Sequence, residues 1–232
     1  MANLNIPNHI AITPDGNRRW AKEHRLPSLE GHRRGFDVAI KIGRKIRSLG
    51  VNTLTMWAFS TENWDRSKEE VNYLMKMYEI FIDKNLKEAM KEKIRIIHLG
   101  RKDRIPKGLL KKIQNSEEKT KSFDKYVLNI ALDYGGRDEV IRAIKKVLSI
   151  KYKVLSINIE NFSQFLDTAN QPHPDPDLII RTSGEMRTSG LMIWQAAYAE
   201  YFFLEKHFPD LNDEDIENAI AEYSRRQRRF GK

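Results

Sequence analysis

The chain contains no cysteine. Disulfide bridges and thiolate metal sites are therefore excluded. Its six histidines show no spacing that is typical of metal ligands, so a zinc site is not expected. Any metal must be held by oxygen or histidine. Scattered carboxylates such as Asp15 and Glu200 favour Mg²⁺, which prefers oxygen ligands.

Long apolar runs are also missing. No stretch approaches the roughly 20 residues that a membrane-spanning helix needs. The N-terminus lacks the basic-then-apolar pattern of a secretory signal, so we expect a cytosolic protein. No linker, repeat or long low-complexity tract divides the 232 residues. We therefore predict a single domain over residues 1–232, which is long enough to bury a substantial core.

Two nucleotide-binding fingerprints are absent, the Walker A loop and Gly-x-Gly-x-x-Gly. The net charge of +9 admits nucleic acid, an anionic membrane surface or phosphorylated small molecules as partners, and composition does not choose among them. The basic run at residues 225–229 suggests a nucleic-acid-binding module. Because no aromatic platform accompanies it, a solvated helix end explains it as well.

Short β-type runs alternate with longer helical patterns, which is typical of a parallel sheet with crossover helices. We predict an α/β fold with a mostly parallel six-stranded sheet. The expected strands cover residues 10–12, 53–59, 94–99, 126–132, 178–181 and 201–204. Ligands of such sheets bind outside the carboxyl ends of the strands. Polar residues follow several of these strands, so we expect the chemistry at that edge.

The expected helices include residues 107–122 and 138–148, and two more carry apolar stripes at helical spacing. The first stripe is Phe36, Ala39, Ile40, Gly43 and Ile46, and the second is Val71, Leu74, Met75, Tyr78, Phe81 and Ile82. The pattern alone favours ordinary core packing over contact with a ligand.

The stretch Asp15-Gly16-Asn17-Arg18-Arg19-Trp20 follows the first strand and opens a helix. The N–H groups of a first helical turn lack partners inside the helix and carry the positive end of its dipole, so this junction favours an anion. An acid here either caps the helix or holds a cation. Taken alone, the stretch favours a plain cap or turn.

A second cluster at residues 181–189 places two arginines around hydroxyls and a glycine. This composition suits a phosphate cradle, although a solvated loop accounts for it equally well. With Arg18, Arg19 and Arg66, the chain has more arginine at strand ends than one phosphate needs. Two phosphate-bearing sites would explain the excess. An arginine-rich, magnesium-assisted site would suit the departure of a diphosphate.

Several segments together closely resemble the cis-prenyltransferases, the undecaprenyl diphosphate synthase family. They are residues 9–12, 15–21, 31–32, 57–66, 128–137, 177–185, 194–195, 197–200 and 228–231, in the order of the family and over nearly the whole chain. The resemblance implies a homodimeric α/β enzyme, one catalytic domain per chain. Each subunit extends an allylic prenyl diphosphate with isopentenyl diphosphate units and forms cis double bonds, with Mg²⁺ as cofactor.

The resemblance also implies residue roles. Asp15 would bind Mg²⁺ and assist diphosphate departure, Glu200 would be a second metal carboxylate, and Asn63 is the candidate for proton removal. The allylic diphosphate would be cradled by Gly16, Asn17, Arg18 and Arg19, with support from His32, Ser60 and Arg66, and Trp64 would lie against the substrate. Isopentenyl diphosphate would be held by Arg181, Arg187 and Ser189. Further substrate-binding candidates are Trp20, Ser28, Thr61, Glu62 and Thr188. The segment Arg229-Phe230-Gly231 resembles an Arg-x-Gly element that completes the site, often across the dimer interface.

Under this resemblance the two apolar stripes flank a hydrophobic tunnel between the sheet and two helices, and the small Ala58 leaves it open. The basic charge then serves diphosphates and the inner face of a membrane, where a long product is delivered as the precursor of a glycosyl carrier lipid. No nucleic-acid partner is expected. A non-catalytic subunit of a heteromeric prenyltransferase is the alternative, although Asp15 and Asn63 are retained.

Two positions depart from the family pattern. Ser28 stands where an arginine is common, so one diphosphate contact is missing or comes from Arg18, Arg25 or Arg33. Pro14 replaces a methionine common in bacterial members. Pro14 therefore points to the archaeal and eukaryotic branches and puts a role in bacterial cell-wall synthesis in doubt.

Overall fold

A computed structural model of the chain describes residues 4–149 and 157–226. These residues form a six-stranded sheet in the order β3-β4-β2-β1-β5-β6, and each neighbouring pair is parallel. The strands are β1 (His9–Thr13), β2 (Thr53–Ser60), β3 (Ile94–Leu99), β4 (Tyr126–Tyr134), β5 (Leu178–Arg181) and β6 (Glu200–Phe203). All six predicted strands are confirmed, with ends moved by at most two residues.

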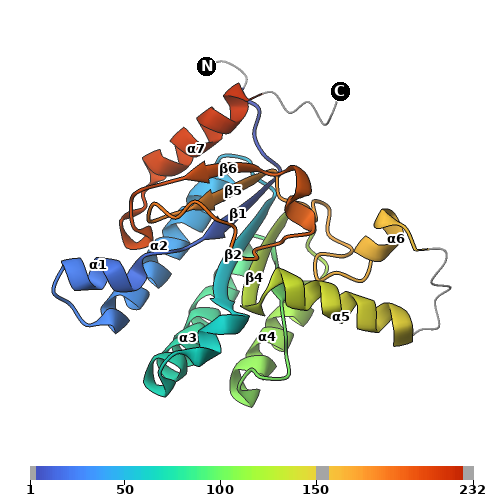
Figure 1. Cartoon of the computed structure of the whole chain (residues 1–232), viewed down its shortest axis with the longest axis horizontal. Helices are drawn as coiled ribbons and strands as arrows, with labels where there is room; N and C mark the ends of the chain where they lie inside the picture. The colour runs from blue at the N-terminus through green and yellow to red at the C-terminus, as the bar shows by residue number, and fades with distance from the viewer. Residues whose placement is uncertain (1–3, 150–156, 227–232) are drawn as a thin grey trace.

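Helices connect the strands (Figure 1). They are α1 (Asn17–Glu23), α2 (Ser28–Ser48), α3 (Lys68–Lys91), α4 (Lys107–Thr120), α5 (Gly136–Ser149), α6 (Ile159–Ser163) and α7 (Asp213–Arg225). Short 3₁₀ turns, η1 (Thr61–Asp65), η3 (Gln195–Tyr198) and η4 (Phe208–Asp210), lie between them. Among the described residues, no helix is long and apolar enough to cross a membrane.

The inner strands β1 and β5 are buried along their whole length, which explains why they read as nearly continuous apolar runs. Ile10 and Ile12 pack with residues of α2 and α7 in one core cluster. Ala11, which points to the opposite face, belongs to a second cluster with Leu191 and Met192. This alternation follows from the two-residue period of a strand.

A large apolar cavity separates part of one sheet face from α2 and α3. All five residues of the first predicted stripe line it. From the second stripe, Tyr78, Phe81 and Ile82 line the cavity, whereas Val71 and Met75 pack into a core cluster. The predicted hydrophobic tunnel between the sheet and two helices is therefore present. Part of the second stripe therefore packs in the core and part lines the cavity. The helical spacing of the stripe does not distinguish these two roles.

Candidate functional site

A polar pocket lies at the carboxyl edge of the sheet, beyond the ends of β1, β2 and β5. Its wall combines these strand ends with residues of α2 and α3. Eight residues predicted from the sequence line it: Asp15, Asn17, His32, Ser60, Asn63, Arg66, Arg181 and Ser189. The fold thus gathers into one pocket side chains from separate parts of the chain.

The Asp15 carboxylate in this pocket is paired with two arginines. Its Oδ2 accepts a hydrogen bond from Arg181 Nη2 at 3.0 Å, and its Oδ1 lies 3.3 Å from Arg19 Nη2. The Gly16 N–H also donates to Oδ1, at 2.8 Å. Burial tends to raise the pKa of this carboxyl, but the Arg181 and Gly16 hydrogen bonds outweigh burial and leave the pKa below its usual value. Asp15 is therefore ionised at neutral pH.

Asp15 does not cap the helix that follows it, so the cap interpretation of this stretch is wrong. Gly16 is the N-cap residue of α1, and no side chain caps that helix end. The carboxylate is instead held by cationic side chains. As in any helix, the N–H groups of the first turn, here those of Asn17, Arg18 and Arg19, have no carbonyl partner inside the helix. The Asp15 side chain does not supply one either.

The backbone around Asp15 is fixed from the neighbouring loop. Thr182 Oγ1 accepts a hydrogen bond from the Asp15 N–H and donates to the Asp15 carbonyl, at 2.9 and 2.8 Å. Gly16 has φ of 96°, and a Cβ atom there would lie 1.9 Å from Ser183 Oγ and 2.5 Å from His207 Nδ1. A glycine is thus required both by the backbone conformation and by this close approach.

Arg181, at the end of β5, links Asp15 to the 181–189 loop. Its side chain is 6% exposed. Nη1 donates to Ser189 Oγ at 2.9 Å and to the carbonyl of Arg187. Its buried Nε has no hydrogen-bond partner among the residues that the structure describes. The guanidinium is therefore rigidly placed, with one donor unused.

Glu70 binds Arg66 and His32 of the pocket wall. It was not among the residues predicted from the sequence. Its Oε1 accepts hydrogen bonds from Arg66 Nη1 at 2.8 Å and from His32 Nε2 at 3.0 Å. Oε2 lies 3.8 Å from Arg18 Nη1. Arg66 precedes α3 in extended backbone, and Glu70 lies in the first turn of that helix, so helical spacing does not predict this pair. The contact with His32 depends on how α2 and α3 pack.

Burial and charge act in opposite directions on this group of residues. Burial tends to raise the pKa of Glu70, but the charge of Arg66 and the hydrogen bond from His32 lower it below its usual value. Burial lowers the pKa of His32, and the hydrogen bond from Glu70 opposes that shift only in part. A carboxylate beside a largely neutral imidazole therefore holds Arg66 in place.

Glu70→Gln is expected to destabilise the fold by about 1–3 kcal/mol, because it removes a charge-assisted acceptor from Arg66 and His32. It should also lower the pKa of His32, since the attraction from the carboxylate is lost. Denaturant unfolding and an NMR titration of the His32 ring measure these changes. Glu69→Gln, at the exposed position next to Glu70, is the control and should change neither. An unaltered unfolding midpoint in Glu70→Gln would contradict the interpretation.

Asn63 reaches the pocket from η1, where it forms a capping box with Ser60. The Ser60 N–H donates to Asn63 Oδ1 at 3.0 Å, and the Ser60 side chain accepts from the Asn63 N–H. These reciprocal bonds fix the direction of the carboxamide. Ser60 and Asn63 are thus one structural unit at the end of β2.

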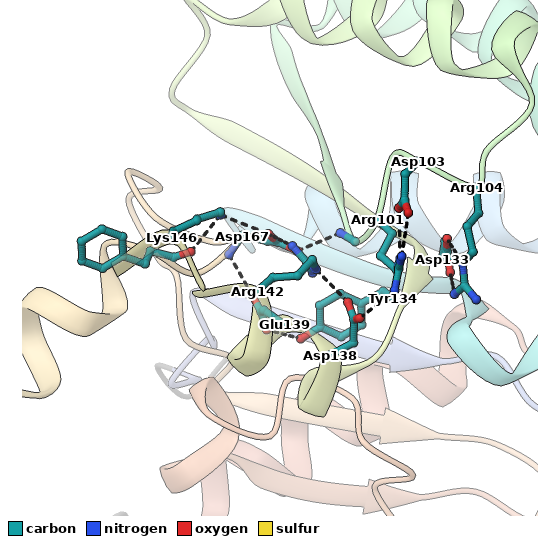
Figure 2. Close-up of polar contacts among 12 residues, drawn as sticks. Arg101, Asp103, Arg104, Asp133, Tyr134, Asp138, Glu139, Arg142, Lys146 and Asp167 are labelled. Carbon is teal, nitrogen blue, oxygen red and sulfur yellow. Dashed lines mark hydrogen bonds and ion pairs between the residues drawn. The ribbon is translucent and has the colours of Figure 1, made fainter. Parts of the chain in front are cut away.

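The turn that carries Asn63 is anchored to a polar network around the ends of β3 and β4, part of which Figure 2 shows. Trp64 Nε1 donates to Asp133 Oδ1 at 2.9 Å. Arg104 donates to both oxygens of the fully buried Asp133 carboxylate. Trp64 is therefore held by Asp133 and is absent from the residues that line the polar pocket.

The structure does not bring the other predicted substrate residues into the pocket wall. Trp20 donates to Asp210, Arg187 pairs with Glu185, and Thr61 lies against the backbone of Gly135. Ser28, Glu62 and Thr188 are exposed. Gly16, Arg18 and Arg19 lie beside the pocket through their contacts with Ser183, Glu70 and Asp15.

Glu200 lies on a different part of the sheet from Asp15. It begins β6 and pairs in register with Leu178, whereas Thr13, two residues before Asp15, pairs with Arg181. Three residues of strand separate these levels, about 10 Å at 3.3 Å per residue. Glu200 Oε2 is bonded to Arg226 Nη1 at 2.9 Å. The two carboxylates do not meet within one chain.

The donor set at the pocket fits one kind of metal site. No group of three or more histidine or acidic side chains that could hold a metal occurs in the described part of the chain. Asp15, with its carboxylate 31% exposed, is the acidic residue in the pocket wall. Mg²⁺ is commonly held by one or two carboxylates together with substrate phosphates, so Asp15 fits a Mg²⁺ that arrives with a phosphorylated substrate.

The polar pocket adjoins the apolar cavity. Five residues line both: Phe36, Ala39, Met56, Ala58 and Tyr78. Arginines and an acid at one end thus adjoin a long apolar space at the other. This arrangement suits a molecule with an anionic head and a long apolar tail.

The sequence is similar to those of known prenyl-transferring enzymes. The family model described as "Putative undecaprenyl diphosphate synthase" matches residues 13–231. An isoprenyl transferase of Thermotoga maritima is 46% identical over 230 residues, covering 98% of each chain. Another, from Aquifex aeolicus, is 43% identical over 229 residues, covering 99% of this chain and 97% of that protein.

Solved structures agree with these sequence relatives. Lavandulyl diphosphate synthase from Lavandula x intermedia, solved in complex with dimethylallyl diphosphate, superposes with a TM-score of 0.93 at 36% identity and covers 98% of this chain and 99% of its own. A probable undecaprenyl diphosphate synthase from Campylobacter jejuni has a TM-score of 0.80 at 33% identity and covers 100% of both chains. The archaeal or eukaryotic branch that Pro14 suggests stays a prediction. So does the role of the Arg229-Phe230-Gly231 segment, which lies outside the described residues.

Proposed function

The chain belongs to the undecaprenyl diphosphate synthase family of cis-prenyltransferases, and from this premise we propose how its site works. The enzyme condenses isopentenyl diphosphate with an allylic prenyl diphosphate. In our proposal the polar pocket holds both diphosphates, the apolar cavity receives the growing chain, and residues 1–232 act as one catalytic domain. The observation that carries this proposal is the shared wall of pocket and cavity.

The allylic diphosphate lies against the first turn of α1 in this proposal. The N–H groups of residues 17–19 supply donors without helical partners. Arg18, 58% exposed and 3.8 Å from Glu70, is free to turn toward the diphosphate. Arg33 is engaged by Glu30 and Asp37. Of Arg18 and Arg25, the two that remain, we choose Arg18 to supply the contact that an arginine at position 28 would make, because Glu70 places it beside the pocket.

Asp15 holds Mg²⁺ together with the allylic diphosphate in this scheme. The bound ion supplies electrostatic stabilisation of the leaving diphosphate. Arg19, 45% exposed and paired with Asp15, can turn a donor to the developing negative charge, while the charge of Arg181 stays fixed beside Asp15. Because Glu200 lies away from the pocket, we assign it no metal contact within its own chain.

Isopentenyl diphosphate binds beside the 181–189 loop. The unused Nε of Arg181 and the exposed guanidinium of Arg187 are the donors we assign to it. Electrons of its terminal double bond form the new carbon–carbon bond as the bond from the primer carbon to diphosphate oxygen breaks. A proton then passes from the condensed chain to the departing diphosphate, and we propose that Asn63, fixed by Ser60, assists this removal.

We also propose a homodimer formed through α5. Ile141, Ile144 and Leu148 lie on one face of this helix and are 52%, 41% and 62% exposed, and such an apolar stripe is typical of an interface. Arg142 fixes the helix to Asp167 (Figure 2). Ile144→Asp should reduce the sedimenting mass toward that of a monomer, whereas Gln114→Asp on the exposed face of α4 should not. A wild-type monomer at assay concentrations would contradict the dimer.

The chain works in the cytosol in this proposal, at the inner face of a membrane that takes up the long product. The net charge of +9 supports contact with anionic lipid headgroups. The product is a precursor of a glycosyl carrier lipid. No nucleic acid takes part. Nothing favours the alternative of a non-catalytic subunit, because Asp15, Asn63 and Arg181 all line one pocket.

One assay tests the proposal. The purified chain is given radiolabelled isopentenyl diphosphate and allylic primers of different length, with Mg²⁺ or with a chelator in excess. We expect label to enter extractable prenyl diphosphates with Mg²⁺ and not with the chelator. Failure to incorporate label with every primer would support the non-catalytic subunit, and unimpaired incorporation with the chelator would reject the role of Mg²⁺.

A further inference from the structure

The apolar cavity has a near end and a far end. At the near end Phe36, Ala58 and Tyr78 also line the polar pocket. Eleven residues of α2 lead from Phe36 to Arg47, another lining residue, or about 16 Å at 1.5 Å per residue. A chain that grows from the pocket therefore advances toward the level of Arg47.

The composition of the wall changes at the far end. Along most of its length the cavity is lined by aliphatic and aromatic side chains. The lysine, arginine, aspartate and glutamate residues among the described lining are Arg44, Arg47 and Glu88, and all three lie in the far halves of α2 and α3. An apolar chain that advances along α2 from Phe36 thus meets its first charged side chain at Arg44.

Arg44 and Glu88 form a two-bonded ion pair across this end. Arg44 Nε donates to Glu88 Oε1 at 2.8 Å, and Arg44 Nη2 donates to Oε2. The pair connects α2 to α3, 44 residues apart in sequence. Arg47 lies 3.7 Å from Glu92 in a second ion pair between α2 and the end of α3. The two helices are therefore bridged by charges in the far part of the cavity.

A chain that passed this point would have to separate Arg44 from Glu88 or cover the pair with hydrocarbon. A hydrocarbon tail offers neither charge nor hydrogen bonds in exchange, and charges removed from water without a partner are costly. Both side chains still contact water, with exposed fractions of 55% and 32%. Continued growth would therefore remove hydration as well as the pairing.

We propose that the Arg44–Glu88 ion pair is the stop at the far end of the cavity, and that it sets the length of the prenyl product. This inference rests on the proposed path of the growing chain through the cavity. It assigns specificity to two residues that have no part in binding diphosphate. Arg44 and Glu88 limit how many isopentenyl units are added, while the rate of the first condensation is independent of them.

The test is product sizing with variants of the pair. Arg44→Ala and Glu88→Ala each remove the bridge, and we expect products longer by one or more five-carbon units. The charge swap Arg44→Glu with Glu88→Arg restores a bridge of opposite direction and should return the products to wild-type length. Lys45→Ala is the matched control, because Lys45 on α2 forms a similar ion pair with Glu217 of α7 and is not part of the cavity wall. Its products should be unchanged.

The outcomes separate the stop from the proposed function. Unchanged product length in both single variants, with the first condensation intact, would overturn the stop. Longer products in the charge swap as well would show that the pairing is not the determinant and would also overturn it. If a single variant does not fold, the charge swap and the other single variant decide the question. Absence of any condensation by the wild-type chain would instead count against the proposed function.

Discussion

Replacing Asp15 with alanine is expected to reduce condensation by at least about 10²–10³-fold, the range seen when one preorganised electrostatic group is removed from an active site. The carboxylate is the acidic group in the pocket wall, and it holds both Arg19 and Arg181. Its loss removes the proposed Mg²⁺ ligand. The fold should persist, because the Asp15 backbone keeps its bonds to Thr182.

Steady-state turnover and thermal unfolding measure the two parts of this prediction. Asp124→Ala, which alters an exposed carboxylate before β4, is the control and should retain full turnover. Asp15→Asn keeps the shape and loses the charge, so it should be nearly as impaired as the alanine variant. Near-normal condensation by Asp15→Ala in saturating Mg²⁺ would reject the assignment.

Replacing Arg181 with alanine is expected to raise the KM for isopentenyl diphosphate by about 10–100-fold. A hydrogen bond to a charged group contributes about 1.5–3 kcal/mol, and 1.4 kcal/mol corresponds to a factor of ten. The side chain is buried and orders the loop through Ser189 and the carbonyl of Arg187. Its removal therefore loosens the loop and also takes one of two arginine partners from Asp15.

Separate kinetic titrations of the two substrates test this effect. Arg181→Lys keeps the charge but not the planar set of donors, so the KM for isopentenyl diphosphate should lie between those of wild type and Arg181→Ala. The KM for the allylic primer should change less in both variants. An unaltered KM for isopentenyl diphosphate in Arg181→Ala would refute the role.

The sheet and its functional edge follow from local patterns. A parallel strand buried on both faces is apolar nearly throughout, so residues 178–181 have the boundaries that their sequence predicts. Polar residues directly after such strands must emerge at one edge. This is why Asp15, Ser60 and Arg181 could be placed in one pocket from sequence.

What local patterns could not supply are contacts set by packing and register. Glu70 meets His32 only because α2 and α3 lie side by side, 38 residues apart in sequence. Trp64 was expected against substrate, but the buried carboxylate of Asp133 holds its indole N–H. Glu200 was expected near Asp15, and the register of β6 with β5 places it lower on the sheet.

The helix-cap interpretation of Asp15 failed for a related reason. A carboxylate before a helix is usually satisfied by the nearest N–H groups, and Asp15 does accept one from Gly16. Arg181, 166 residues away in sequence, is the stronger partner because it is charged and rigidly held. Local propensity described the stretch correctly as a turn. The direction of its carboxylate is set by the tertiary contact with Arg181.

The central claim is that one continuous site holds a diphosphate at the carboxyl edge and a growing prenyl chain between the sheet and α2 and α3. The most direct test is a crystal structure of the protein with an unreactive analogue of a long allylic diphosphate. We predict the diphosphate against Asn17 and Arg18 and the hydrocarbon tail past Ala58 and Phe36, ending before Arg44 and Glu88. A tail that lies outside this cavity, or a diphosphate bound away from the Asp15 pocket, would contradict the account.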